Sequence, residues 1–219
     1  MAAEDGGQAG KIVLALRAAG VDPADFEGHV YTADLAAHLG PDGAFAVDPY
    51  KQALAMLGMA AAGQEVPTAA VDWLEGSQSA EGSWDDGFGT LENADATAMA
   101  VMALLAAGRS SGDPSLAAAI EFLSANQAAE GGWAYGPGLS TSANSTALVI
   151  QVLIALGVDP TATEGEWAKG GRSPLDALLA FQSDSGAFQT DFGDGPFDDF
   201  YSTVQAIPAA AGVALPPEG

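Results

Sequence analysis

Four polar or aromatic residues recur in one register along the chain, and their side chains could hydrogen-bond a ligand or transfer a proton. Three of them lie 13 residues before a helix-ending glycine, and the fourth keeps the same register before the last helix. The four are Tyr50, Asp95, Asn144 and Tyr201. If the helices that they begin run parallel, the side chains converge on one mouth, where the helix N-termini attract negative charge. Two interpretations stay open: the four cap free helix amides, or they line a ligand-binding mouth.

Other polar residues accompany this register. Thr97, Thr146 and Thr203 follow two residues later, and Asp198 and Asp199 precede the last helix. Gln151 and Gln205 interrupt helices that are otherwise apolar, and a buried amide needs a hydrogen-bond partner, so both join the candidate ligand-binding residues. The acidic stretch from Asp191 to Asp199 could hold Ca²⁺ or form turns, although it matches no defined calcium loop.

The elements that must position these residues are set by an internal repeat. A signature of the form polar-x-x-x-Gly-x-aromatic occurs three times, and a fourth copy begins with Leu. The copies are Leu39–Gly43–Phe45, Gln78–Gly82–Trp84, Gln127–Gly131–Trp133 and Gln182–Gly186–Phe188. Their spacing of 39 to 55 residues predicts stacked units, since one such unit cannot bury its apolar face alone.

Each unit is expected to contain two helices. The first is amphipathic, as in Pro67–Glu75, whereas the second is apolar nearly all round, as in Ala96–Ala106. This contrast predicts an outer ring and an inner ring of helices, with four pairs between Tyr31 and Ala211 and one further inner helix near residues 8–19. We expect the signature to seal neighbouring units: the glycine permits a left-handed turn, the aromatic ring covers the joint, and the Gln amide binds free backbone groups. Trp167 lies in a Gly-rich linker and is expected to matter less.

The signatures Gln78–Trp84 and Gln127–Trp133 resemble the Gln-Trp repeat of the squalene cyclase and protein prenyltransferase superfamily. The resemblance implies an all-α fold, an α/α toroid, in one domain over residues 1–212 with an exit tail at 213–219. A full toroid of this superfamily uses about twelve helices, so nine helices imply an incomplete ring. We therefore expect self-association, or an N-terminal portion supplied from elsewhere, because an open arc exposes apolar flanks.

The chemistries of this superfamily were tested against the residues present. Class II cyclases protonate an alkene with the central acid of an Asp-x-Asp-Asp motif, but the pairs Asp85-Asp86 and Asp198-Asp199 have Ser83 and Pro196 two positions upstream. The complete motif is therefore missing, and the inner helices offer few aromatic rings to stabilise carbocations. The absence of Cys excludes the thioester and the zinc ligand set of other relatives, and His29 and His38 are expected on an outer helix facing solvent. No metal site is expected, and no cofactor or catalytic residue is assigned.

Composition limits the partners. Lys+Arg 6 against Asp+Glu 29 gives a net charge of −23, which repels phosphate backbones and so argues against nucleic acid. No apolar run reaches the length of a membrane span, and residues 1–10 do not form a signal peptide. The compartment stays open, although the family resemblance favours an extracellular or cell-surface location.

Three functions remain as expectations. The first is a binding domain that captures a bulky, partly apolar, lipid-like ligand at the cavity mouth, similar to the cobalamin carriers of the superfamily. The second is an enzyme acting on a terpenoid or prenyl substrate, with Asp95 as the nearest candidate for its acid. The third is a structural module of a larger surface protein. An aromatic-lined cavity would favour the enzyme, a shallow polar mouth would favour binding, and a filled centre would favour the structural module.

Overall fold

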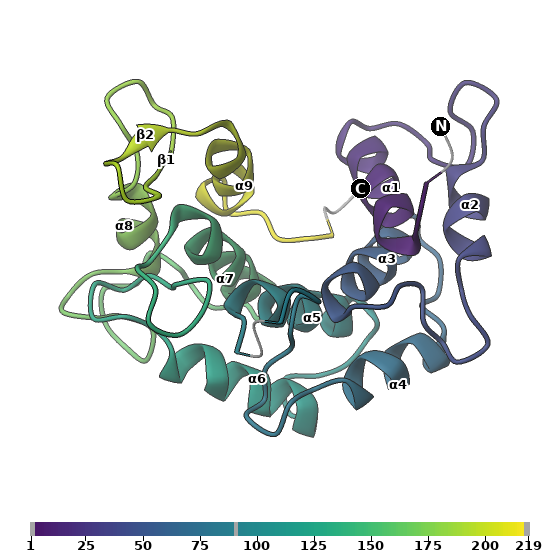
Figure 1. Cartoon of the computed structure of the whole chain (residues 1–219), viewed down its shortest axis with the longest axis horizontal. Helices are drawn as coiled ribbons and strands as arrows, with labels where there is room; N and C mark the ends of the chain where they lie inside the picture. Colours follow the sequence, from purple (N-terminus) through teal and green to yellow (C-terminus); the bar gives the residue numbers. More distant parts are fainter. Residues whose placement is uncertain (1–2, 90–91, 217–219) are drawn as a thin grey trace.

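Nine helices form an open arc in the computed structural model, which describes residues 3–89 and 92–216 (Figure 1). Five inner helices line the concave side, each packed against the next: α1 (Gly6–Ala18), α3 (Pro49–Ala61), α5 (Ala94–Ala106), α7 (Ala143–Ala155) and α9 (Phe200–Ala210). Four outer helices cover the convex side: α2 (Tyr31–Ala37), α4 (Thr68–Gly76), α6 (Pro114–Ala125) and α8 (Pro174–Leu179). One short antiparallel pair, β1 (Gln189–Thr190) with β2 (Phe197–Asp198), precedes α9. The expected all-α, incomplete α/α toroid is confirmed.

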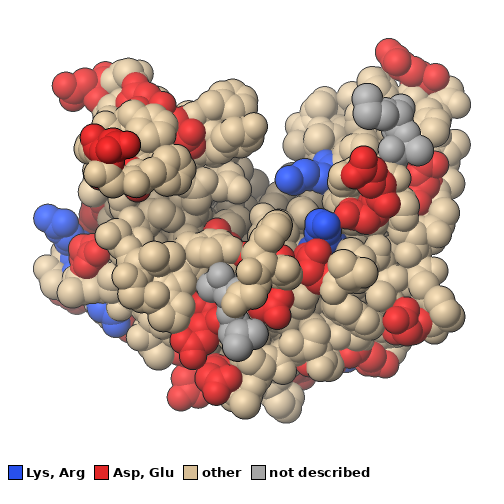
Figure 2. All heavy atoms as spheres, viewed as in Figure 1, with Lys and Arg blue, Asp and Glu red and all other residues tan. Residues whose placement is uncertain are grey.

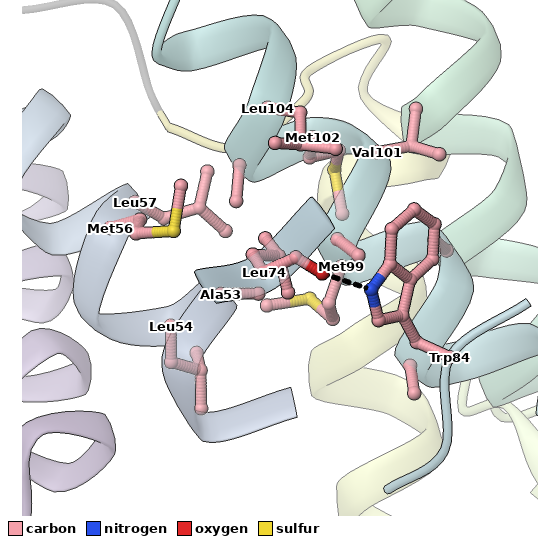
Figure 3. Packing of buried hydrophobic residues seen from close by; sticks show 14 of the residues in the cluster. Ala53, Leu54, Met56, Leu57, Leu74, Trp84, Met99, Val101, Met102 and Leu104 are labelled. Carbon is pink, nitrogen blue, oxygen red and sulfur yellow. Dashed lines mark hydrogen bonds between the residues drawn. The ribbon is translucent and has the colours of Figure 1, made fainter. Parts of the chain in front are cut away.

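The core between the inner and outer helices is filled by side chains of α3, α5 and α7 together with those of the outer helices. Leu57, Met99 and Met102 are each at most 1% exposed, and Leu54 and Leu148 belong to the same cluster. Figure 3 shows the methionines of α3 and α5 packed against Leu57, Leu74 and Trp84. Because these helices are apolar on almost every side, they can only be stable when they are surrounded in this way.

The two signature tryptophans lie in the same geometry. Trp84 is fully buried, and its Nε1 donates to the carbonyl of Leu74 at 2.7 Å (Figure 3). The backbone N–H of Trp84 donates to Oγ1 of Thr97 at 3.1 Å. Trp133 repeats both contacts, with the carbonyl of Leu123 at 2.7 Å and Oγ1 of Thr146 at 3.0 Å. Each ring therefore joins the end of an outer helix to the start of the following inner helix.

The signature glutamines connect one unit to the next. Nε2 of Gln78 donates to the carbonyl of Gly82 at 2.9 Å and to that of Ser115, in α6, at 2.8 Å. Nε2 of Gln127 donates in the same way to the carbonyls of Gly131 and Trp167, at 2.9 and 2.8 Å. The amide thus satisfies two carbonyls that would otherwise be unpaired at the joint.

In the first unit, a residue of the inner helix makes the contacts that the signature Gln makes in the other units. Leu39 has no amide, and Gln52 of α3 occupies the register of the threonines instead. Its Nε2 donates to the carbonyls of Gly43 and Ala70 at 3.0 and 3.2 Å, and its Oε1 accepts from the N–H of Phe45 at 2.7 Å. One buried Gln therefore replaces both the signature Gln and the threonine.

Two local expectations differ from the structure. Trp167 was expected to matter less, yet it is only 9% exposed and its ring centroid lies 6.0 Å from that of Trp133. His29 is exposed, as expected, but it precedes α2 rather than lying on it, and its Nε2 contacts Oδ2 of Asp34 at 2.6 Å. In both cases a linker residue contacts a residue of another segment, and helical periodicity does not report such contacts.

Among the described residues, no helix combines the length and the apolar character needed to cross a membrane.

Candidate functional site

The N-termini of the inner helices are capped by residues that lie two positions before the four candidates. In each cap residue, the side chain accepts a hydrogen bond from the backbone N–H of the residue three positions later. The four caps are Asp48, Asn93, Ser142 and Asp199. Of the candidates, only Asp199 is therefore a cap. The expectation that Tyr50, Asp95, Asn144 and Tyr201 satisfy free helix amides is wrong, so other interactions must account for them.

Asp95 is the most unusual ionisable group in the described part of the chain. Its Oδ1 is shut off from solvent and has no hydrogen-bond partner among the described residues. Burial raises the pKa of Asp95 to about 6; a hydrogen bond from Ser145 of α7 opposes the shift, and the charge of Asp86 adds to it. On the other side, burial and then the charge of Asp95 raise the pKa of Tyr50 in α3 to about 12. The arrangement holds a carboxyl group that is partly protonated near neutral pH beside a protonated phenol.

Asp95 was singled out from the sequence by its register at the start of α5. The segment around it does not match the cyclase motif, because aligning Asp95 with the central acid of Asp-x-Asp-Asp places Asn93 and Ala96 at the two other acidic positions. Asn93 is the helix cap, and its Nδ2 donates to Oδ2 of Asp86 at 3.1 Å.

Asn144 bridges two inner helices. Its Nδ2 donates to Oε1 of Gln205 in α9, and its Oδ1 accepts from Oγ of Ser202 at 2.8 Å. Gln205 therefore already has a partner within the protein. These three residues join α7 to α9, and the structure does not bring them into contact with the pair formed by Tyr50 and Asp95.

The remaining candidates at this end lie on the surface. Tyr201 is 74% exposed and packs edge-on against Phe200. Asp198 is exposed, and the pKa of its carboxyl is lowered by the hydrogen bond from Oγ of Ser185, which lies at 2.6 Å. Asp199 caps α9, and the N–H of Ser202 holds the pKa of Asp199 below its usual value.

The acidic stretch forms turns. Oδ1 of Asp191 accepts from the N–H groups of Gly193 and Gly195 at 2.7 and 3.1 Å, which is the turn chemistry expected of Asp before Gly. Over residues 3–89 and 92–216, no three His, Asp or Glu side chains gather closely enough to hold a metal ion.

A hollow of about 560 Å³ lies on the concave side, at the opposite ends of α5 and α7 from the four candidates. Met102, Leu105 and Ile154 line it from the two helices. The segment after α9 closes it, because residues 212–216 lie along its edge and Leu215 packs against the main core. Of the expected exit tail at 213–219, residues 217–219 lie outside the described ranges.

Gln151 is a buried polar residue of α7. It is 2% exposed, its Nε2 reaches the carbonyl of Ala147 at 3.5 Å, and its Oε1 has no partner among the described residues. A buried carbonyl oxygen without a donor is costly, so a hydroxyl or amide placed beside it would be stabilised. Sequence periodicity could place Gln151 inside the arc, but it could not show which of its atoms lacks a partner.

Comparison with known proteins supports the fold through structure alone. No protein-family model and no curated protein matches the sequence. The ent-copalyl diphosphate synthase of Streptomyces platensis is similar over 95% of this chain and 40% of its own, at 23% identity and a TM-score of 0.63. The type II terpene cyclase MstE of Scytonema is similar over 95% of this chain and 72% of its own, at 17% identity and a TM-score of 0.64.

A variant of MstE in complex with its substrate, geranylgeranyl dihydroxybenzoate, is also similar, at 19% identity and a TM-score of 0.66 over 95% of this chain and 73% of its own. These neighbours are type II terpene cyclases, members of the squalene cyclase-like superfamily. At this level of identity the likeness concerns the architecture: the chain has the α/α-toroid fold of the type II terpene cyclases, in an incomplete arc.

Proposed function

We propose that the arc binds a bulky, largely apolar ligand of the prenyl type on its concave side. The observation that carries this proposal is the hollow of about 560 Å³ that Met102, Leu105, Ile154 and Leu215 line. Its volume falls within the range of about 300–1,000 Å³ that small-molecule sites occupy. The side chains that line it are aliphatic, and polar atoms form as much of its surface as apolar atoms do. Unbranched Met side chains can adjust to an irregular apolar chain.

One further feature supports the proposal. A protein of the same fold, MstE, has been obtained in complex with a geranylgeranyl substrate, so this fold is compatible with binding a prenyl chain.

Equilibrium dialysis with labelled geranylgeraniol tests this binding. Leu105→Arg places a charge in the wall of the hollow and should weaken binding by at least about tenfold. Leu139→Arg, at a position that is 59% exposed and distant from the hollow, is the matched control and should bind as the wild type does. Equal affinity in both variants would contradict the proposed location. If the wild type fails to bind, the proposal fails and a structural role takes its place.

A second function, proton transfer to a prenyl substrate, is favoured by Asp95 specifically. A carboxyl group with a pKa of about 6 can donate a proton near neutral pH. In such a step an alkene carbon takes the proton of Asp95, which leaves a carboxylate and a carbocation. The inner helices offer this cation few aromatic rings, since their buried residues are mainly Ala, Met, Val and Leu. We therefore rank this function below binding.

Incubation with squalene and with geranylgeranyl diphosphate, followed by gas chromatography, separates the two functions. We expect no cyclic product above a boiled control. A product that Asp95→Asn abolishes, and whose rate falls as the pH rises through about 6, would establish proton transfer instead.

A further inference from the structure

The last inner helix exposes an apolar stripe to solvent. On α9, Phe200 is 73% exposed, Val204 48% and Ile207 56%, and the three lie at helical spacing on one face. The stripe stands at one tip of the arc (Figure 1). Large apolar side chains gathered in this way on a helix mark a surface that another element covers.

The register of the helices identifies what kind of surface this is. Ser142 caps α7 and Asp199 caps α9, so the two helices correspond at an offset of 57 residues. The face of α7 that holds α9 consists of Ala143, Ala147 and Ile150, which form one cluster with Ala206 and Ala209 of α9. At that offset these three positions correspond to Phe200, Val204 and Ile207. The exposed stripe on α9 is therefore the equivalent of the surface with which α7 packs against the inner helix that follows it.

The other tip of the arc presents the complementary half of this interface. Asp5 caps α1, so α1 and α9 correspond at an offset of 194 residues. The positions of α1 that match Ser202, Gln205, Ala206 and Ala209 are Gln8, Lys11, Ile12 and Ala15. Of these, Gln8, Lys11 and Ala15 are exposed and Ile12 is half-buried. Like the docked face of α9, this flank combines small and polar residues.

Contacts between α1 and α3 show that the register is correct. A Cβ placed on Gly10 would lie 2.3 Å from the carbonyl oxygen of Leu54 and 2.7 Å from Cα of Ala55, and one placed on Gly58 would lie 2.7 Å from Cα of Gly10. Leu54, Ala55 and Gly58 are the residues of α3 that correspond to Gln205, Ala206 and Ala209 of α9. The same positions therefore face the preceding helix at both ends of the arc.

Charge distinguishes the two tips. The segment 173–219 contains seven acidic residues and no Lys or Arg, whereas α1 carries Lys11 and Arg17. In Figure 2, acidic atoms lie on both arms of the arc, and Lys and Arg atoms face the gap between the arms from the α1 side. Two α9 tips placed together would bring only acidic segments together, whereas α1 contributes Lys11 and Arg17 beside the acids Glu4 and Asp5. Because Asn144 contacts Gln205 across the α7–α9 interface, the same register places Lys11 of a second copy beside Tyr201.

We propose that the occupant of the α9 stripe is α1 of a second copy of this chain. α9 and α1 stand on opposite sides of the gap in the arc, and both lie at its open end (Figure 1). A twofold rotation about an axis parallel to the inner helices, placed beyond this open end, therefore brings each α9 against the other copy's α1. The two arcs then form one closed ring of ten inner helices, all running in the same direction, and the interface is made twice. This proposal does not depend on the proposed ligand.

Sedimentation equilibrium of the whole 219-residue protein tests the ring. We expect a dimer that Ile207→Asp, on α9, weakens at least about tenfold, because the substitution buries a charge. Ala15→Arg, on the exposed flank of α1, should weaken it to a similar extent. Val47→Asp, at a position that is 93% exposed on a loop, is the control and should leave the dimer intact. Circular dichroism of each variant confirms that the helices are retained.

The Ala15→Arg variant distinguishes a dimer in which α9 packs on α1 from one in which α9 packs on α9. If Ala15→Arg still dimerises while Ile207→Asp does not, the two α9 stripes face each other and the proposal is wrong. A monomeric wild type, or a mass that grows beyond the dimer as concentration rises, would also contradict a closed ring of two arcs. Mixing the two monomeric variants should restore a heterodimer, since one intact α9 and one intact α1 then remain to form a single interface.

Discussion

The second and fourth units share one signature turn but differ in what packs against it. In both, the glycine has a positive φ, 86° at Gly82 and 89° at Gly186, and the signature Gln donates to the carbonyl of that glycine. A Cβ on Gly82 would lie 2.5 Å from the carbonyl oxygen of Ala118 in α6, whereas a Cβ on Gly186 would meet nothing within 4 Å. Gln78 reaches a second carbonyl on the next unit, but Gln182 is exposed and contacts its own turn only.

The signature therefore has two separate roles: it forms a turn within its own unit, and it contacts the outer helix of the next unit. The turn and the threonine that accepts the aromatic N–H are formed in both units, at 3.1 Å for Trp84 with Thr97 and at 2.9 Å for Phe188 with Thr203. Sealing requires a following outer helix, which the fourth unit lacks among the described residues. The apolar core reflects the same division, because one large cluster runs from α1 to α7 and a small one joins α7, α8 and α9.

The largest expected effect is that of the aromatic residues. Trp84→Ala should lower the free energy of unfolding by about 3–5 kcal/mol, because it leaves a cavity in the large cluster and removes the bond to Leu74. Phe188→Ala should cost less, about 2 kcal/mol, because the small cluster beside α9 can collapse around the gap. Urea denaturation of both variants measures the two losses. Equal losses would show that the two units are sealed to the same degree.

The signature glycines should differ next. Gly82→Ala combines a strained left-handed conformation with a collision against the backbone of α6, so we expect a loss of about 3 kcal/mol. Gly186→Ala suffers the conformational strain alone, about 1 kcal/mol. Thermal unfolding of the pair gives the difference. A Gly82→Ala variant as stable as Gly186→Ala would mean that α6 moves away without cost.

The stability of the protein should depend on pH in opposite directions through Asp95 in the sealed region and Asp199 in the open one. Burial raises the pKa of Asp95 to about 6, so the folded state retains a proton that the unfolded state has already lost. As the pH rises from about 4 to about 6, the free energy of unfolding should therefore fall by an amount on the order of 2–3 kcal/mol. The pKa of Asp199 is lowered, so its contribution is gained as the pH rises through that lowered value towards the ordinary one.

Asp95→Asn and Asp199→Asn test this contrast. The stability of Asp95→Asn relative to the wild type should increase from pH 4 to pH 7, and that of Asp199→Asn should not. Denaturant midpoints at several pH values provide the measurement. If the Asp95→Asn difference is independent of pH, the carboxyl group is ionised in the folded protein as it is in water.

The smallest effect concerns the signature amides. Gln78→Ala removes two hydrogen bonds and should cost about 1–3 kcal/mol, whereas Gln182→Ala removes one exposed bond and should cost about 0.5 kcal/mol. A double variant should be additive, since the two residues belong to different units. Equal single losses would argue that the bond from Gln78 to Ser115 contributes nothing.

Much of the fold was predictable because repetition and periodicity report burial. The nine helices, their pairing into two rings and the incompleteness of the arc follow from the spacing of Gly82, Gly131 and Gly186 and from the apolar composition of α5 and α7. Boundaries were close: the helix expected near residues 8–19 begins at Gly6 and ends at Ala18. The substitution of Gln52 for a signature Gln could not be foreseen, because it depends on side chains meeting across a joint.

The candidate site was less predictable. Register gave the four residues at the N-termini, but it could not show that the caps lie two positions earlier, nor that Asn144 is already paired with Gln205. The hollow was not foreseen, since it depends on the path of the segment 212–216. Burial of one oxygen of Asp95 is likewise a property of packing between three helices, and no pattern within one helix reports it.

Native-state hydrogen exchange with resolution of each helix tests most directly the claim that the arc is sealed inside and open at α9. The measurement uses the Ile207→Asp variant, so that association cannot cover the stripe. We expect α5 and α7 to exchange only by global unfolding, and α9 to exchange on the order of 100-fold faster through local opening. Equal protection of α9 and α5 would contradict this claim, because the last unit would then be sealed as firmly as the others.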